Sequence, residues 1–179
     1  MIMEWSQKRT ARTLIRTVWF GALIVMSPVR TRAADATVLV GLVSAGGPHP
    51  SVSVAFGYCP SVAGFEIEYF GTLGGETADH SGLGGIFASL LVQLPTTSNL
   101  QFFGLVGFGI WGETFADGTA TGVLNAKNVG GGVKIGIAEH VRLRLDYRLF
   151  ALADPEEDGS RRPSTRFPQR LSAGLQLVF

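Results

Sequence analysis

The sequence lacks most of the residues that build disulfide frameworks, metal centres and helical membrane anchors. Its 179 residues include one cysteine and three histidines, and only 16% are charged. The single Cys59 excludes an internal disulfide. Beyond the N-terminal region there is no apolar run of about 18 residues, the length that a membrane-spanning helix needs. These absences exclude a disulfide-stapled domain and a helical membrane protein.

Positive charge is also scarce once the N-terminal region is set aside. From residue 37 onward the chain has nine Lys or Arg against twelve Asp or Glu. A mature chain that is acidic and has no basic run gives no support for nucleic-acid binding. No phosphate-cradling loop, cysteine cluster or nucleophile elbow is present. We therefore expect no nucleic-acid partner, no cofactor and no bound metal.

The N-terminal region has the pattern of a secretory signal peptide. Lys8, Arg9, Arg12 and Arg16 precede a short apolar core at 17–26. Residues 34–36 then fit the small-x-small cleavage pattern, and 31–33 fit it less well. An uncleaved anchor is disfavoured because the apolar core is too short to span a bilayer of about 30 Å. The sequence thus predicts an exported chain with a signal peptide at 1–36 and a mature domain at 37–179.

What the mature chain does contain is glycine, phenylalanine and a repeated alternation of apolar and polar residues. At its C-terminal end every second residue is apolar, from Leu171 to the last residue, Phe179. This alternation predicts a strand with one apolar face and one polar or tightly filled face. The whole sequence has 24 glycines and 12 phenylalanines, all but Gly21 and Phe20 in the mature chain, which suits many short strands joined by tight turns.

Seven earlier segments show the same pattern, so the sequence predicts eight strands. Their expected ranges are 37–44, 51–58, 62–70, 85–94, 100–111, 125–137, 141–151 and 170–179. Short connections follow the second, fourth and sixth strands, and longer ones follow the third, fifth and seventh. The first connection, which includes Pro48 and Pro50, is the exception because it is short. Even strand number and alternating connection lengths are typical of transmembrane barrels.

The seventh segment shows why alternation alone leaves the environment of the strands open. Leucines and Tyr147 lie on one face, and Arg142, Arg144, Asp146 and Arg148 lie on the other. A soluble lipocalin-like barrel would bury the leucines, whereas a membrane barrel would turn them toward lipid. Three features favour the membrane: the export signal, the terminal Phe179, and aromatic residues near both ends of the predicted strands. The rim aromatics are Phe56, Tyr58, Phe102 and Phe179 at one end and Tyr69, Phe108 and Tyr147 nearer the other.

The chain from 37 to 179 resembles the small outer-membrane barrels of the OmpA/OmpX-like superfamily. The resemblance rests on the eight-strand pattern, on residues 143–148 and on the closing segment 171–179. It implies an all-β, eight-stranded, antiparallel up-and-down transmembrane β-barrel in the outer membrane of a Gram-negative-type bacterium. It also implies a monomer surrounded by outer-membrane lipid. Periplasmic chaperones and the barrel assembly machinery would be its partners, the latter reading the C-terminal strand with Phe179 as its assembly signal. We expect the barrel without the peptidoglycan-binding domain of OmpA-type proteins.

A barrel of eight strands is just wide enough for side chains to fill it. The third and seventh strands lie on opposite walls of such a barrel, so Glu66 should meet Arg144, and Glu68 should lie near Asp146 and Arg148. Charges removed from water must be paired. The expected lumen charge network is Glu66, Glu68, Lys134, Arg142, Arg144, Asp146 and Arg148, with Gln93, Gln101, Arg170 and Gln176 able to join. The network could be a structural plug or the gate of a small pore.

The histidines give no support for catalysis. His49 is expected in a loop between two prolines, His140 at a turn, and His80 in a solvated loop with Asp79 and Glu76. We therefore predict a structural outer-membrane barrel that is not an enzyme. The first alternative is a barrel that binds or transports a small apolar or lipidic ligand. A soluble periplasmic lipocalin-like binder is the second and less favoured alternative. An apolar ligand of the first kind could bind in an apolar half of the lumen formed by five inward-facing residues: Phe87, Leu91, Phe103, Leu105 and Trp111.

Overall fold

The chain is almost entirely β-strand where the computed structural model describes it. The described residues are 34–45, 47–73, 82–94, 99–114, 120–153 and 165–179. The strands are β1 (Ala34–Ser44), β2 (Pro48–Tyr58), β3 (Ala63–Thr72), β4 (Gly82–Gln93), β5 (Leu100–Thr114), β6 (Ala120–Gly136), β7 (Val141–Ala153), β8 (Thr165–Arg166) and β9 (Gln169–Val178). Among these residues no helix has the length and apolar character to cross a membrane. Most of the predicted signal peptide, and the loop that carries His80, lie outside the described residues.

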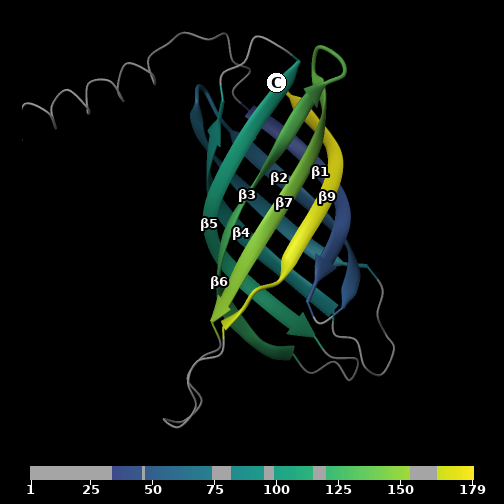
Figure 1. The fold of residues 1–179 in the computed structure, drawn as a ribbon, viewed down its shortest axis with the longest axis vertical. Coiled ribbons are helices and arrows are strands. Elements are labelled where there is room, and N and C mark those ends of the chain that lie inside the picture. The colour runs from purple at the N-terminus through teal and green to yellow at the C-terminus, as the bar shows by residue number, and fades with distance from the viewer. Residues whose placement is uncertain (1–33, 46, 74–81, 95–98, 115–119, 154–164) are drawn as a thin grey trace, which may run out of the picture.

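Eight long strands close into an antiparallel barrel (Figure 1). From β1 to β7 each strand pairs with the next along the chain, and β9 pairs with both β7 and β1. The two-residue β8 only extends β7, pairing at Leu152 and Ala153. The predicted eight-stranded, antiparallel, up-and-down barrel is thereby confirmed. Closure also removes the unpaired strand edges that would otherwise invite aggregation.

The two ends of the barrel differ in their connections. The short turns after β2, β4 and β6 lie at the end where Ala34 and Phe179 exchange backbone hydrogen bonds of 3.3 and 3.0 Å. We call this the turn end; it is at the top of Figure 1. The connections after β1, β3, β5 and β7 leave from the opposite end, the loop end. Among these, the one from β1 to β2 covers only residues 45–47, which is the predicted exception.

The N-terminal strands are longer than predicted. Ala34 to Ala36 belong to β1 and pair with β2 and β9. Pro48 and Pro50, expected to break the chain, lie inside β2, so the placement of His49 in a loop is wrong. Proline is tolerated at the start of a strand, where the missing N–H costs least. Pro50 still accepts a backbone hydrogen bond of 2.7 Å from Leu73 N.

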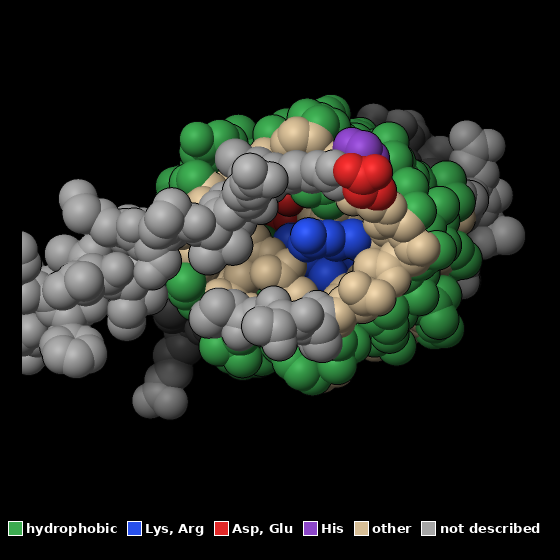
Figure 2. Space-filling model, turned by 90° about the horizontal axis from the view of Figure 1, so that it is seen from above, with side chains coloured by type: hydrophobic (Ala, Val, Ile, Leu, Met, Phe, Trp, Pro, Cys, Tyr) green, Lys and Arg blue, Asp and Glu red, His purple; other side chains and the backbone are tan. Residues whose placement is uncertain are grey.

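The outer wall of the barrel is apolar and the lumen is largely polar. Leu90 and Phe108 are 67% and 71% exposed on the outside, whereas Arg144 and Arg148 are fully buried inside. Viewed from the turn end, hydrophobic side chains ring the barrel and basic side chains occupy its mouth (Figure 2). A soluble barrel has the opposite arrangement, since its apolar residues form the core. This inversion matches a barrel that faces lipid.

Candidate functional site: the barrel lumen

The centre of the lumen holds charged side chains from opposite walls. β3 supplies Glu66 and Glu68, which face inward because side chains alternate along a strand. Across the lumen, β7 supplies inward residues of the same parity, and β9 adds Arg170 at its loop-end side. We call six residues the charge network; each is at most 1% exposed: Glu66, Glu68, Arg144, Asp146, Arg148 and Arg170. Three carboxylates thus face three guanidinium groups.

Arg148 is the hub of this network. Its Nη2 lies 2.7 Å from Glu66 Oε1, and its Nη1 lies 2.6 Å from Glu68 Oε2. Its Nε lies 2.9 Å from Asp146 Oδ1 on the same strand. One planar side chain therefore contacts three carboxylates through three different nitrogens. Lysine, a single point charge, could not reproduce this geometry.

The other two arginines complete the pairing. Arg144 contacts Glu66 through two nitrogens and lies 2.6 Å from Asp146 Oδ2. Arg170 Nη2 donates to both oxygens of Glu68, at 2.6 and 2.8 Å. Because each carboxylate meets two arginines, the charges balance locally and their removal from water is compensated. The network joins β3, β7 and β9 across the lumen.

Two glycines of β6 leave the space that the network needs. A Cβ atom on Gly130 would lie 2.9 Å from Arg148 Cγ and 2.4 Å from the carbonyl oxygen of Tyr147. A Cβ atom on Gly132 would lie 3.0 Å from Phe103 Cζ and closer still to the backbone of Leu145. The run of glycines at 130–132 thus lets long side chains of β5 and β7 lie against the β6 wall.

An aromatic layer covers the charge network on the loop-end side. It consists of four fully or almost fully buried rings: Phe70, Phe87, Trp111 and Phe150. Their centroids are 5.1 to 6.0 Å apart in tilted and edge-on contacts. The Arg170 guanidinium lies 5.2 Å from the Phe70 ring centroid. A cation–π contact therefore links the aromatic layer to the charges beneath it.

The predicted apolar half of the lumen is not continuous. Phe87 and Trp111 belong to the cluster at the loop end. Leu91, Phe103 and Leu105 form a separate cluster with Cys59. Arg144 lies with its guanidinium 4.5 Å from the Phe103 ring centroid, so the second cluster borders the charges. In the described part of the lumen the apolar residues are thus divided into two clusters, with Arg170 against the first and Arg144 against the second.

The remaining predicted lumen residues lie toward the turn end. Lys134 is 2% exposed and donates to Gln93 Oε1 at 3.3 Å. Arg142 is only partly buried and donates to Gln101 Oε1 at 2.8 Å. Lys134 Nζ lies 4.0 Å from Asp35 Oδ2, whereas Glu66 and Glu68 pair with Arg144, Arg148 and Arg170. Lys134 and Arg142 therefore form a second polar region beside the charge network.

Sequence reasoning missed two contributors to the lumen. Asp35 lies 4.0 Å from Lys134 Nζ, but the predicted signal peptide includes it, so alternation along the mature strands does not predict it in the lumen. Phe70 has the same parity as Glu66 and Glu68, so alternation along the third strand could have identified it. Phe70 is not among the predicted lumen residues, because an apolar residue at the end of a strand has no charge that would mark the lumen face.

The described histidines lie in separate elements of the barrel. His49 lies in β2 and His140 lies in the turn before β7. His80 and its acidic neighbours lie outside the described residues. Within the described ranges, no group of three or more His, Cys, Asp or Glu side chains is placed to hold a metal ion.

Comparison with known proteins identifies the fold. No protein-family model and no curated protein sequence matches the chain. Among solved structures it is similar to Neisserial surface protein A, at 18% identity and a TM-score of 0.60, over 82% of this chain and 96% of that one. It is also similar to a de novo designed transmembrane β-barrel, at 15% identity and a TM-score of 0.52, over 86% of this chain and 100% of that one. The shared fold is the eight-stranded transmembrane β-barrel.

Proposed function

We propose that this transmembrane barrel is a structural component of the outer membrane of a Gram-negative-type bacterium, a monomer without enzymatic activity. The observation that carries the proposal is the filled lumen inside an apolar outer wall. A barrel whose interior is filled with balanced ion pairs and with rings in tilted and edge-on contact is expected to be rigid. Its role would then be envelope integrity, with outer-membrane lipid as its main contact. Fractionation with outer membranes, together with an SDS-resistant band that shifts on heating, would test this location and fold.

The lumen offers two successive barriers to a passing solute. The charge network ties β3 to β7 and β9 at the centre of the barrel. The aromatic layer fills the loop-end half with apolar rings. A hydrated ion would have to break ion pairs at one barrier and lose its water at the other. These two layers favour a plug over a gated pore.

The plug makes a prediction for conductance. In planar-bilayer recording, wild-type protein should give a silent trace, and Arg144→Ala should remain silent. The substitution opens part of the charge network, but it leaves the aromatic layer of Phe70, Phe87, Trp111 and Phe150 in place. A porin reconstituted in the same way serves as the positive control. Discrete conductance steps that appear in Arg144→Ala would instead identify the network as a gate.

The terminal phenylalanine should matter more for assembly than for stability. The Phe179 ring is 63% exposed, and its backbone N–H donates to Ala34 O at 3.0 Å. Phe179→Ala keeps that backbone bond and removes only the ring. We expect reduced outer-membrane levels in cells, with an unfolding midpoint of the refolded protein close to wild type. Deletion of Phe179 should give the same or a larger loss.

Phe167→Ala provides the matched control, because Phe167 is another exposed ring, at 59%. Its outer-membrane level should stay near wild type. Normal outer-membrane levels of the variant that lacks Phe179 would refute its role as an assembly signal for the barrel assembly machinery and periplasmic chaperones.

The position of Asp35 bears on the mature N-terminus. Cleavage after Ala36 would remove three residues that pair with β2 and β9, including Asp35. Cleavage after Ala33 would leave β1 complete and keep the contact between Asp35 and Lys134. We therefore expect the mature chain to begin at Ala34. Intact mass measurement of protein purified from membranes would check this, and a mass that corresponds to a start at Thr37 would contradict it.

A further inference from the structure

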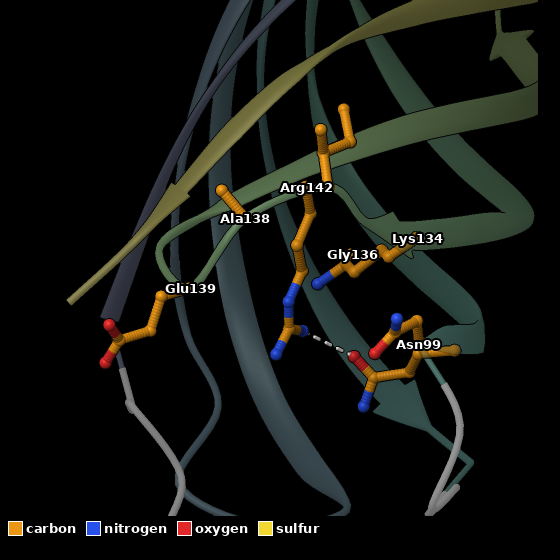
Figure 3. Close-up of a pocket in the computed structure, with 8 residues that line it drawn as sticks. Asn99, Lys134, Gly136, Ala138, Glu139 and Arg142 are labelled. Atoms are coloured by element: carbon orange, nitrogen blue, oxygen red, sulfur yellow. Dashed lines mark hydrogen bonds between the residues drawn. The ribbon is translucent and has the colours of Figure 1, made fainter.

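The turn end of the lumen contains a polar cavity that the plug does not explain. It has a volume of about 380 Å³, and residues of the β4–β5 turn, β5, β6, the β6–β7 turn and β7 line it. In Figure 3, Lys134 and Arg142 point into this space, while Glu139 of the turn points away from it. A water molecule takes about 30 Å³, so the cavity has room for a polyatomic ion with its waters.

The cavity is lined by two basic side chains and one acidic side chain: Lys134, Arg142 and Glu139. The Arg142 guanidinium donates to a neutral amide oxygen, that of Gln101, and Lys134 donates to that of Gln93. Lys134 Nζ also lies 4.0 Å from Asp35 Oδ2. The two cations converge on one space, whereas Glu139 points away from it (Figure 3).

The barrel wall beside the cavity contains buried polar atoms. Gln176 is opposite Arg142 in the β7–β9 ladder and is fully buried, yet neither of its side-chain polar atoms has a hydrogen-bond partner. Thr37, opposite Gln176 in the β1–β9 ladder, is also fully buried with an unpartnered hydroxyl. Neither residue lines the cavity, so these atoms show that the adjoining wall is polar.

We propose that this cavity is a binding site for a small oxyanion of the phosphate type, held by Lys134, Arg142 and Gln101. Guanidinium and ammonium groups are the side chains that bind phosphate oxygens in proteins. The Gln101 amide, bonded to Arg142, orients the guanidinium and presents its own N–H groups. The site lies in the lumen mouth and does not depend on whether the barrel conducts.

The experiment is a phosphate titration of the full mature barrel, refolded in an uncharged maltoside detergent. Amide NMR shifts of Gly136 and Ala138 should move and saturate with inorganic phosphate, and much less with chloride. Arg142→Gln and Lys134→Met should each weaken binding about tenfold, since each removes a charge-assisted hydrogen bond. Lys127→Gln, which removes a positive charge from the outer wall of β6, should bind as wild type does.

A heat-modifiability gel on each variant separates loss of the site from loss of the fold. Absence of a saturable shift in the folded wild-type protein would overturn the proposal, as would equal affinity in wild type, Arg142→Gln and Lys134→Met.

Repeating the titration in bilayer discs with phosphatidylglycerol identifies the source of the oxyanion. A weaker apparent affinity there marks a lipid headgroup as the natural occupant, and an unchanged affinity marks a free ion. A silent conductance trace is compatible with either result, so this test stands apart from that of the plug.

Discussion

Replacing Arg148 with methionine should lower the free energy of unfolding of the barrel by about 3–5 kcal/mol. Arg148 contacts Glu66, Glu68 and Asp146 at 2.7, 2.6 and 2.9 Å, and all four side chains are buried. Removing the hub leaves three carboxylates for two remaining arginines, so one negative charge stays in the lumen without full compensation. Reversible urea unfolding in lipid vesicles, followed by tryptophan fluorescence, measures the effect.

Two further variants show whether the loss of unfolding free energy in Arg148→Met comes from the missing charge or from the missing contact geometry. Arg148→Lys keeps the charge but cannot contact three carboxylates at once, so it should recover only part of the stability. Lys127→Met removes a cation that lies exposed on the outer wall, outside the charge network, and should change stability far less. A loss of less than about 1 kcal/mol for Arg148→Met would mean that these ion pairs behave like solvated surface pairs. The ion pairs of the charge network would then not account for a rigid plug.

Replacing Val40 with arginine should destabilise the barrel by about 2–4 kcal/mol in a bilayer. Val40 lies near the middle of β1, between Val52 and Ala173 on the flanking strands, and is 59% exposed on the outer wall. An arginine there must enter the hydrocarbon or bend toward the headgroups. In a soluble barrel the same substitution would add a solvated charge and cost little. Vesicle unfolding of Val40→Arg thus distinguishes a lipid-facing wall from a solvated one.

The depth of the substitution provides the control. Tyr58 is the last residue of β2 at the turn end and is 44% exposed. Tyr58→Arg should cost about 0–1 kcal/mol, because an arginine near the interface reaches water. Equal costs at both positions would show that the wall around Val40 does not face hydrocarbon.

Much of the lumen could be predicted because a closed barrel of known strand number fixes which walls face each other. Alternation puts Glu66 and Glu68 on one face, and an outer wall that faces lipid turns this face inward. Closure puts β7 opposite, and Arg144 does meet Glu66 across the lumen. Arg170, predicted as able to join, pairs with Glu68. The separation of Lys134 and Arg142 from this network was not foreseeable, since it depends on strand tilt and side-chain reach, which alternation does not encode.

One prediction was wrong where a local signal competed with pairing. Pro48 and Pro50 indicate a break in the sequence, but they pair with Ser44 and Leu42 of β1 and lie in β2. Long-range pairing overrode a short motif there. Asp35 fits a cleavage pattern in the sequence, and in the structure it pairs with Gly57 of β2 and Val178 of β9.

The strand number, the up-and-down order and the two sets of residues that share a face can all be predicted from the sequence, because side chains alternate with a period of two. That period is symmetric, so alternation alone does not tell which set lies inside. In the closed barrel, Glu66, Arg144 and Arg148 lie in the lumen, and Leu171 and Phe179 lie on the outer wall. This arrangement is stable because charges can leave water when an opposite wall supplies their partners, and that wall exists only once the barrel is closed.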